Sequence, residues 1–534
     1  MMYFSIVMSV IKMLFKAFVF VGGYWIFIVL SPFLIYELTP LYNNQQYSPI
    51  WIFISDVLVY IALALMLLTT IQNIIRMVKK DRSFSIIKAI LNWQGSNIGI
   101  ESKFDGCAVA LKSAKDLSGV VFGKKGKKYI TKPEMADGHI LCVGGAGSGK
   151  TTAIAIPTLM SWNERVFVID IKGELYEKTK DFRDASKIKV FNPTDHAAFG
   201  YDPYYMLYHT DDISGEARSL ALSICPLSAD NKDPFWIKSS QNMLTGFVLY
   251  YFEMGLNFSE TMAHIKSKPV KDSVDEIMIS GNKKAVAEIS QFAGMDEKTL
   301  SGVFAELSNH ITIFATNDDL QRALDGSGTY ITPADIEEGY DIYCCIPEYK
   351  LDQWKDLLGM MCNQFLKYFE RRPDTNTAPI LFLIDEFPRL GKIETISNGL
   401  ATLRSRKIHI ALFVQSKSQL NAIYGNDVAE VISDNCSYKA ILKASEPNTQ
   451  EWCSKLVGTY DKLKKSSSYN ADIIGIGQGQ GTSTSTEDKR IIKPEEFAYL
   501  KDIVCVFPNG YRRMKKIKYW EDKAFVSGRR NDHE

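Results

Sequence analysis

A glycine-rich octapeptide at residues 144–151 constrains the fold of this chain more than any other feature. It reads GGAGSGKT and matches in full the pattern GxxxxGK followed by Ser or Thr. Four apolar residues, 140–143, precede it directly, and a helix-length segment follows. A strand, a glycine loop and a helix in this order form a P-loop, whose backbone N–H groups surround phosphate oxygens at a helix N-terminus. A chance match in a glycine-rich turn is the alternative, and the flanking strand and helix disfavour it.

Each position of this motif has an expected role. Lys150 is expected to reach the β- and γ-phosphates of a nucleotide, and the hydroxyl of Thr151 is expected to bind Mg²⁺. The motif therefore predicts ATP and Mg²⁺ as cofactors. The predicted nucleotide-binding residues are consecutive: Gly144, Gly145, Ala146, Gly147, Ser148, Gly149, Lys150, Thr151 and Thr152.

A second apolar segment, residues 381–384, ends in two carboxylates, Asp385 and Glu386. Downstream of a P-loop, such a strand end supplies the acidic part of the site. Asp385 is expected to hold Mg²⁺ through water, and Glu386 to orient and polarise the attacking water. A protein that only binds nucleotide does not need the second carboxylate, so the pair predicts an ATP hydrolase.

Three further polar residues flank the next apolar strand, residues 408–414. Gln415 follows it and would sense the γ-phosphate if this strand neighbours the acidic one; a strand-end glutamine that bonds to backbone is an equal alternative. Arg404 and Arg406 precede the strand, and in a ring of subunits either could reach a neighbour's γ-phosphate as an arginine finger. A solvated basic helix end is the simpler interpretation, and the sequence does not choose between the two arginines.

The soluble part, from about residue 81, alternates short apolar runs with helix-length amphipathic segments, which predicts an α/β fold. Uninterrupted apolar runs are typical of buried parallel strands. The expected strands are residues 140–143, 166–171, 188–191, 342–346, 380–384, 408–414, 438–442 and 504–507, preceded by a lysine-rich hairpin at 120–130.

Strand signals nearly vanish between residues 205 and 331. Helices are expected there at residues 213–224, 236–252 and 298–314, so this segment is predicted to be an all-α insertion. Residues 466–488 are rich in Gly, Ser and Thr and lack apolar periodicity, which predicts a mobile loop.

Two apolar segments near the N-terminus predict a membrane hairpin. Residues 17–36 carry no charged side chain and residues 50–75 carry one, Asp56. Each is long enough to cross ~30 Å of hydrocarbon. The connection between them lacks Lys and Arg, whereas basic residues flank the outer ends of the pair, so both termini are expected in the cytoplasm.

Neither the charge balance nor the cysteines point to another class of site. The 62 Lys and Arg residues and 61 Asp and Glu residues give a net charge of +1, so a nucleic-acid surface would have to be local. The nine cysteines form no CxxC pair, which argues against a zinc site and a disulfide framework.

These signals divide the chain into four parts. They are a membrane anchor at 1–80 with spans at about 14–36 and 50–75, the first part of the nucleotide-binding domain at 81–204, the all-α insertion at 205–331, and the second part of the nucleotide-binding domain, with the acidic strand, at 332–534.

In this order the motifs resemble the coupling-protein ATPases of type IV secretion and conjugation, of the TraG, TrwB and VirD-like type. The lead-in at His139, the DIKGEL segment at 170–175, the IDEFPRLG segment at 384–391 and the glutamine segment at 414–420 all look like motifs of this family. Together the matches cover roughly residues 120–525.

The resemblance implies a RecA-like P-loop NTPase domain with an inserted all-α domain behind a transmembrane hairpin, assembled as a homo-hexamer in the bacterial inner membrane. It assigns catalysis to Lys150, Thr151, Asp385, Glu386 and Gln415. Its implied partners are inner-membrane components of the secretion channel and a cargo of relaxase–DNA complex, protein effectors or both.

Two other functions stay open. One is an FtsK-like membrane-anchored DNA translocase, against which the chain shows no winged-helix-like C-terminal module. The other is a nucleotide-gated cargo receptor or scaffold with little hydrolysis, against which the presence of Glu386 argues.

Overall fold

The computed structural model describes residues 109–227, 233–374, 377–469 and 480–526. The predicted membrane anchor, residues 1–80, lies outside them. Among the described residues, no helix is both long enough and apolar enough to cross a bilayer.

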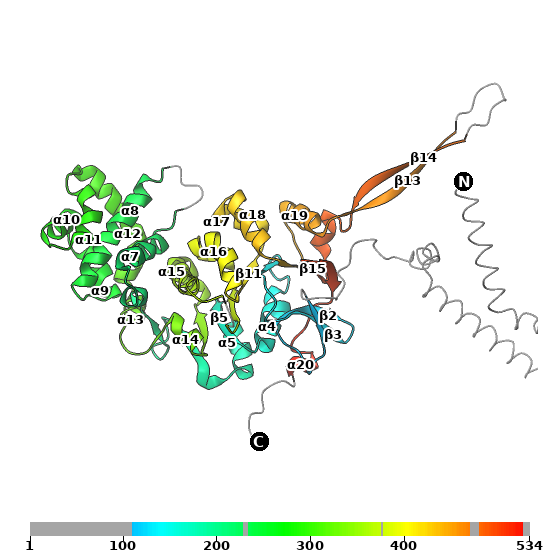
Figure 1. Cartoon of the computed structure of the whole chain (residues 1–534), viewed down its shortest axis with the longest axis horizontal. Helices are drawn as coiled ribbons and strands as arrows, with labels where there is room; N and C mark the ends of the chain where they lie inside the picture. Colours follow the sequence, from blue (N-terminus) through cyan, green and yellow to red (C-terminus); the bar gives the residue numbers. More distant parts are fainter. Residues whose placement is uncertain (1–108, 228–232, 375–376, 470–479, 527–534) are drawn as a thin grey trace, which may run out of the picture. The chain divides into compact units, whose positions relative to one another are not determined.

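A nine-stranded sheet built from distant parts of the chain forms the centre of the described part (Figure 1). Seven consecutive strands run parallel, and each of the last two strands at one side pairs antiparallel with its neighbour. Across the sheet the order is β16 (Gly510–Met514), β15 (Ile503–Phe507), β12 (Tyr438–Ile441), β4 (Ile140–Val143), β11 (Ile408–Val414), β10 (Ile380–Ile384), β5 (Arg165–Asp170), β9 (Asp341–Cys345) and β6 (Ile188–Phe191).

Both faces of the sheet are covered, which explains the uninterrupted apolar runs. In β4, Leu141 and Val143 belong to one hydrophobic core, while Ile140 and Cys142 belong to another on the opposite face. Because successive side chains of a strand point to opposite faces, every position of a doubly covered strand is apolar. The expected strand positions are confirmed, but the last one, β15, runs antiparallel; its run looks the same because it is also mostly buried.

Helices cover the two faces in two sets. The first core is covered by α15 (Leu351–Phe369), α16 (Glu394–Ser405), α17 (Lys417–Tyr424) and α18 (Asn426–Asn435), and it extends into the helices that follow β6. The second core is covered by α4 (Ile156–Ser161), α5 (Glu174–Thr179) and the small sheet of β1 (Ala110–Lys112), β2 (Val120–Lys125) and β3 (Lys128–Lys132). The antiparallel pair of β2 and β3 confirms the predicted lysine-rich hairpin.

The segment after β6 is helical, as expected. Side-chain caps begin several of its helices: Asn257 and Glu260 form a capping box, and Asp296 accepts from the N–H of Thr299. The helices are α6 (Tyr205–Tyr208), α7 (Ile213–Ile224), α8 (Phe235–Glu253), α9 (Phe258–Ser267), α10 (Val270–Ile279), α11 (Lys283–Ile289), α12 (Glu297–Thr316) and α13 (Asp318–Ala323). A short parallel pair, β7 (Gly200–Tyr201) and β8 (Tyr330–Ile331), joins the points where the chain leaves for these helices and returns through α14 (Pro333–Glu337).

The predicted loop at 466–488 is wrong for the residues that the structure describes. After α19 (Pro447–Val457), β13 (Thr459–Tyr469) and β14 (Gln480–Arg490) pair antiparallel over eleven residues each. Composition misled the prediction because a two-stranded ribbon is held by its backbone hydrogen bonds, and Thr and Tyr favour extended backbone whether or not an apolar pattern is present.

Candidate functional site

The glycine loop at 144–151 leads from β4 into a helix that begins with a π-helical turn, η2 (Thr151–Ala155). Backbone hydrogen bonds fix it to both neighbours: the N–H of Gly144 donates to Val414 O at 3.1 Å, and that of Gly145 to Lys443 O at 2.8 Å. A Cβ at Gly144 would lie 2.6 Å from Ser148 Oγ, so no larger residue fits there. The loop is therefore a rigid cradle held by β11 and the end of β12.

The interior of this cradle matches a phosphate group. The buried Lys150 folds back across the loop, and its Nζ donates to Gly144 O at 2.7 Å. Ser148 Oγ is also buried and has no hydrogen-bond partner among the described residues. An ammonium and an unpaired hydroxyl beside a glycine loop are suited to an anion with several acceptor oxygens.

The acidic end of β10 and the P-loop lie at the same end of the sheet, beside the C-terminal ends of the parallel strands. β10 is separated from β4 by β11 alone, and all three strands are parallel, so their C-terminal ends meet there. Gln415, at the end of β11, donates from Nε2 to Glu386 Oε2 at 2.8 Å. The prediction that the strand before Gln415 lies next to the acidic strand is confirmed. The Gln415 side chain contacts the carboxylate of Glu386 and is therefore not bonded to backbone alone.

The two carboxylates have unusual local environments. Burial, and then the negative charge of Glu386, raise the pKa of Asp385 to about 6, while Lys150 opposes this shift. The Glu386 backbone has φ +50°, a left-handed conformation that costs an L-residue ~1–2 kcal/mol. Strain of this kind gathers at functional sites. With the Thr151 hydroxyl, Asp385 offers the hard oxygen ligands that Mg²⁺ prefers, so the residues present fit a magnesium nucleotide.

Asp170, from the family-like segment at 170–175, ends β5 beside the acidic strand. Its carboxylate accepts from the N–H of Tyr176 at 2.8 Å, within the first turn of α5. Lys172 reaches the exposed Glu348 at 3.6 Å. These contacts support a structural role for Asp170 in a strand–helix turn, beside the chemical role that the family-like segment also allows.

Arg404 and Arg406 lie near the N-terminal ends of the parallel strands, opposite to the end that carries the P-loop. They precede the first residue of β11, whereas Gln415 follows its last, and seven residues of strand span roughly 23 Å. Arg404 is exposed, and Arg406 lies 3.8 Å from Asp374. Neither guanidinium is brought to the P-loop of its own chain.

Sequence reasoning missed one residue of the site, Lys516. Its Nζ donates to the carbonyl oxygen of Ser148 at 2.7 Å, inside the P-loop motif. The two residues are 368 positions apart. No local pattern marks this lysine, because it is brought there by the antiparallel pair of β15 and β16, after which it follows.

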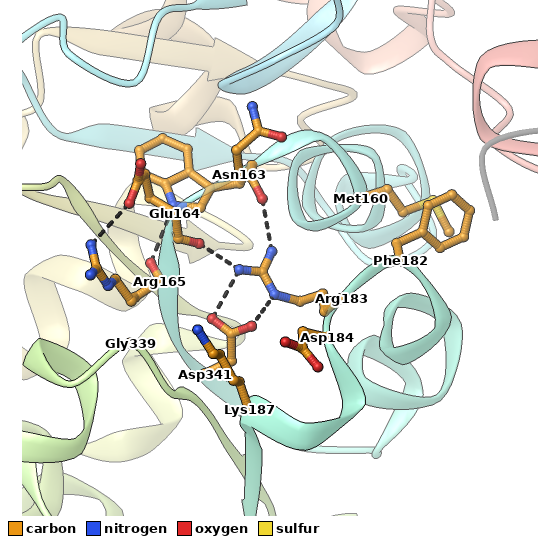
Figure 2. Close-up of a pocket in the computed structure, with 11 residues that line it drawn as sticks. Met160, Asn163, Glu164, Arg165, Phe182, Arg183, Asp184, Lys187, Gly339 and Asp341 are labelled. Carbon is orange, nitrogen blue, oxygen red and sulfur yellow. Dashed lines mark hydrogen bonds and ion pairs between the residues drawn. The ribbon is translucent and has the colours of Figure 1, made fainter. Parts of the chain in front are cut away.

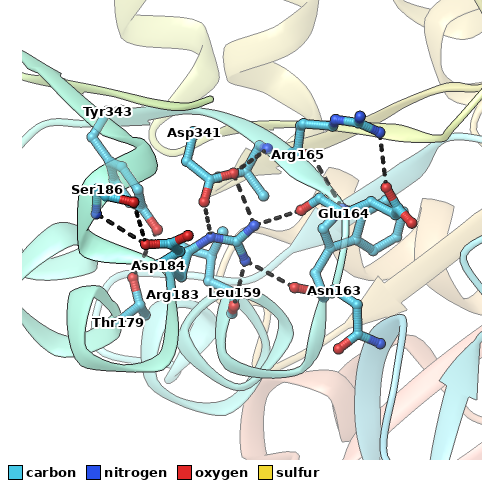
Figure 3. A network of polar contacts seen from close by, with 12 residues as sticks. Leu159, Asn163, Glu164, Arg165, Thr179, Arg183, Asp184, Ser186, Asp341 and Tyr343 are labelled. Atoms are coloured by element: carbon cyan, nitrogen blue, oxygen red, sulfur yellow. Dashed lines mark hydrogen bonds and ion pairs between the residues drawn. The ribbon is translucent and has the colours of Figure 1, made fainter. Parts of the chain in front are cut away.

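A cavity of about 360 Å³ lies at the end of the sheet where β5 and β9 begin (Figure 2). The Arg183 guanidinium at its wall uses all five N–H groups: two on Asp341, and three on the carbonyl oxygens of Leu159, Trp162 and Glu164 (Figure 3). This saturated arginine ties β9 and the segment before β5 to α4, and it has no donor left for a ligand.

Comparisons with known proteins agree with this geometry. A family model described as "Type IV secretory system Conjugative DNA transfer" matches residues 87–532. Protein VirD4 of Agrobacterium fabrum is 24% identical over 433 residues, covering 76% of this chain and 63% of that protein. Conjugal transfer protein TraG of Escherichia coli is 24% identical over 405 residues, covering 65% of this chain and 60% of that protein. The chain thus spans about three fifths of the length of these curated relatives.

Solved structures show the same fold. The coupling protein TrwB in its trigonal form with sulphate superposes with a TM-score of 0.62 at 19% identity, covering 79% of this chain and 97% of that one. TrwB in complex with ADP and Mg²⁺ gives a TM-score of 0.58 at 19% identity, covering 71% of this chain and 84% of that one. The predicted RecA-like P-loop domain with an all-α domain is confirmed as the fold.

Proposed function

Because the chain belongs to the family of type IV secretory system conjugative DNA transfer proteins, we propose that it is the coupling ATPase of a type IV secretion system. It hydrolyses ATP to recruit relaxase–DNA complex, protein effectors or both, and delivers them to the channel. The observation that carries this proposal is the hydrogen bond between Gln415 and Glu386 at the edge of the sheet that holds the P-loop.

The proposed roles follow from the positions of the side chains. Lys150 releases Gly144 O and binds the β- and γ-phosphates, and Thr151 with Asp385 holds the metal site. Mg²⁺ would neutralise charge on the phosphates. Glu386 accepts a proton from the attacking water, and Gln415 fixes the orientation of that carboxylate. The loop at 144–152 binds the phosphate chain through backbone N–H groups other than those of Gly144 and Gly145, which are bonded to Val414 and Lys443.

Arg404 and Arg406 are proposed to act between subunits of a homo-hexamer. Their position away from the P-loop of their own chain supports a contact with a neighbour's site. Arg404 is the stronger candidate because Arg406 already pairs with Asp374, whereas Arg404 is exposed.

The membrane topology and domain division are part of the same proposal. Two spans at about 14–36 and 50–75 anchor the chain in the bacterial inner membrane with both termini in the cytoplasm, which the basic flanking residues support. The nucleotide-binding domain comprises 81–204 and 332–534, and the all-α domain 205–331. Inner-membrane components of the channel are the expected partners of the anchor.

The two alternatives differ from this proposal in what they require. An FtsK-like translocase is not favoured, because the family match covers residues 87–532. A receptor that only binds nucleotide leaves Glu386 without a purpose, although the residue is held in a strained backbone and bonded by Gln415.

The test uses the full chain in its native membrane. Lys150→Ala and Glu386→Gln should each reduce cargo transfer by at least ~100-fold at unchanged protein level, because each removes a group required for phosphoryl transfer. Lys172→Ala, which removes an exposed ion pair, is the matched control and should transfer normally. Crosslinking during active transfer then identifies whether DNA or protein is the cargo. Wild-type transfer by Glu386→Gln would refute the proposal.

A further inference from the structure

The chain after β16 crosses the lysine-rich hairpin on its way past the P-loop. Lys515 exchanges two backbone hydrogen bonds with Lys124 of β2, both 3.0 Å long. Asp522 accepts from Lys124 Nζ at 2.6 Å and from the hydroxyl of Tyr129. Phe525, in α20 (Lys523–Val526), packs edge-on against the Tyr129 ring at 6.0 Å. The segment 515–525 is therefore fixed to the same small sheet that covers the P-loop helix.

Lys516 is the side chain of this segment that reaches the P-loop. Its Nζ lies 2.7 Å from the carbonyl oxygen of Ser148, whose own hydroxyl is buried without a partner in the described part of the chain. Hydrogen bonds from a charged donor are about twice as strong as neutral ones. Burial lowers the pKa of Lys516, and Lys443 also lowers it while Asp502 raises it. A positive charge held in these surroundings acts strongly on a nearby anion.

Lys516 also lines a cavity of about 440 Å³ with an excess of positive charge. Lys124 pairs there with Asp522, and Lys518 pairs with Glu521. Five lysines against two acids leave an excess of three positive charges. The charged lining residues are Lys124, Lys127, Lys516, Lys518, Lys523, Glu521 and Asp522. Lys516 thus lines this basic cavity and also contacts the P-loop.

We infer that Lys516 is a positioning residue of the nucleotide site, which holds the Ser148 carbonyl outward and adds positive charge beside the bound phosphates of a nucleoside di- or triphosphate. The inference rests on the proposed function. By keeping that carbonyl turned away, Lys516 leaves the N–H groups of the loop directed at the phosphates. The C-terminal segment thereby becomes part of the nucleotide site.

The experiment measures equilibrium binding of a fluorescent ADP with Mg²⁺ to the purified full chain at several salt concentrations. Lys516→Met should weaken binding by ~10–100-fold, the range for loss of a hydrogen bond to a charged group. Lys516→Arg should bind within threefold of wild type, because it restores the charge and a donor. Lys516→Gln keeps a donor but no charge and should lie between Met and Arg.

The matched control is Lys515→Met, which removes one charge from the exposed neighbouring residue and should bind within twofold of wild type. The inference is overturned if Lys516→Met and Lys516→Gln both bind the nucleotide with wild-type affinity. It is also overturned if Lys515→Met weakens nucleotide binding as much as Lys516→Met does. If Lys516→Met does not fold, Lys516→Gln carries the test, and a fall in its nucleotide-free melting temperature with unchanged affinity also overturns it. Absence of nucleotide binding by the wild type refutes the proposed function itself, so the two failures are distinguishable.

Discussion

The carboxyl of Asp385 is expected to make metal-dependent nucleotide binding sensitive to pH in a range where ordinary aspartates are fully ionised. Burial and the charge of Glu386 raise its pKa from 3.8 to about 6. Metal binding requires the ionised form. At pH 5, a group of pKa about 6 is ionised in roughly a tenth of molecules, whereas one of pKa 3.8 is ionised in roughly nine tenths. The affinity for Mg²⁺ with nucleotide should therefore fall about tenfold between pH 8 and pH 5.

The same pKa shift affects the stability of the nucleotide-free fold in the opposite direction, so that stability is greater at low pH. A carboxyl whose pKa is higher in the folded state stabilises the fold below pH 3.8, and this contribution is lost as the pH rises through about 6. The full shift corresponds to roughly 3 kcal/mol. Asp385→Asn, which imitates the protonated form, should therefore raise the melting temperature of the nucleotide-free chain at pH 8 and not at pH 4.

The assay is calorimetric titration of the full chain with Mg²⁺ and ADP from pH 5 to pH 8. Glu386→Gln removes the negative charge that helps to raise the pKa of Asp385. The affinity of this variant should therefore fall less between pH 8 and pH 5 than that of the wild type. Protonation of ADP itself affects the wild type and the variant equally. Glu348→Gln, which removes an exposed acid that pairs with Lys172 and Arg389, is the control and should behave as wild type. A wild-type loss no larger than that of Glu386→Gln would refute the reasoning.

Three further predictions follow from single contacts. Asp341→Asn should destabilise the fold by ~3–5 kcal/mol, because it leaves the buried Arg183 charge without its partner; an unchanged melting temperature would contradict this. Gly144→Ala should reduce nucleotide binding more than tenfold, since its Cβ would meet Ser148 Oγ at 2.6 Å, whereas Gly294→Ala, with open space around it, should bind normally. Gln415→Ala should slow ATP turnover by ~10–100-fold with nucleotide affinity within threefold, because it frees the Glu386 carboxylate; equal loss of affinity would indicate a binding role instead.

Much of the central sheet was predictable because its strands are covered on both faces. The apolar runs in β4, β10 and β11 follow from that burial, and Lys150, Asp385 and Glu386 follow the C-terminal ends of two of these parallel strands. The P-loop motif, the strand before it and the helix after it are consecutive in the sequence, so the local sequence is enough to predict them.

Features that depend on long-range pairing were not predictable in the same way. The contact of Gln415 with Glu386 required knowing that β11 lies between β4 and β10. The direction of β15 left no trace in its apolar run. Lys516 lies 368 positions from Ser148 in the sequence and is brought to it by the pairing of β15 with β16. The pairing of β13 with β14 depends on backbone hydrogen bonds, which composition does not record.

The rate of ATP hydrolysis by the purified full chain tests the central claim most directly. If the edge formed by the P-loop, Asp385, Glu386 and Gln415 is a hydrolytic site, Glu386→Gln should bind ATP within about threefold of wild type and hydrolyse it at least ~100-fold more slowly. Hydrolysis by Glu386→Gln at the wild-type rate, or a wild type that binds ATP without any turnover in the presence of its cargo and membrane partners, would contradict the account.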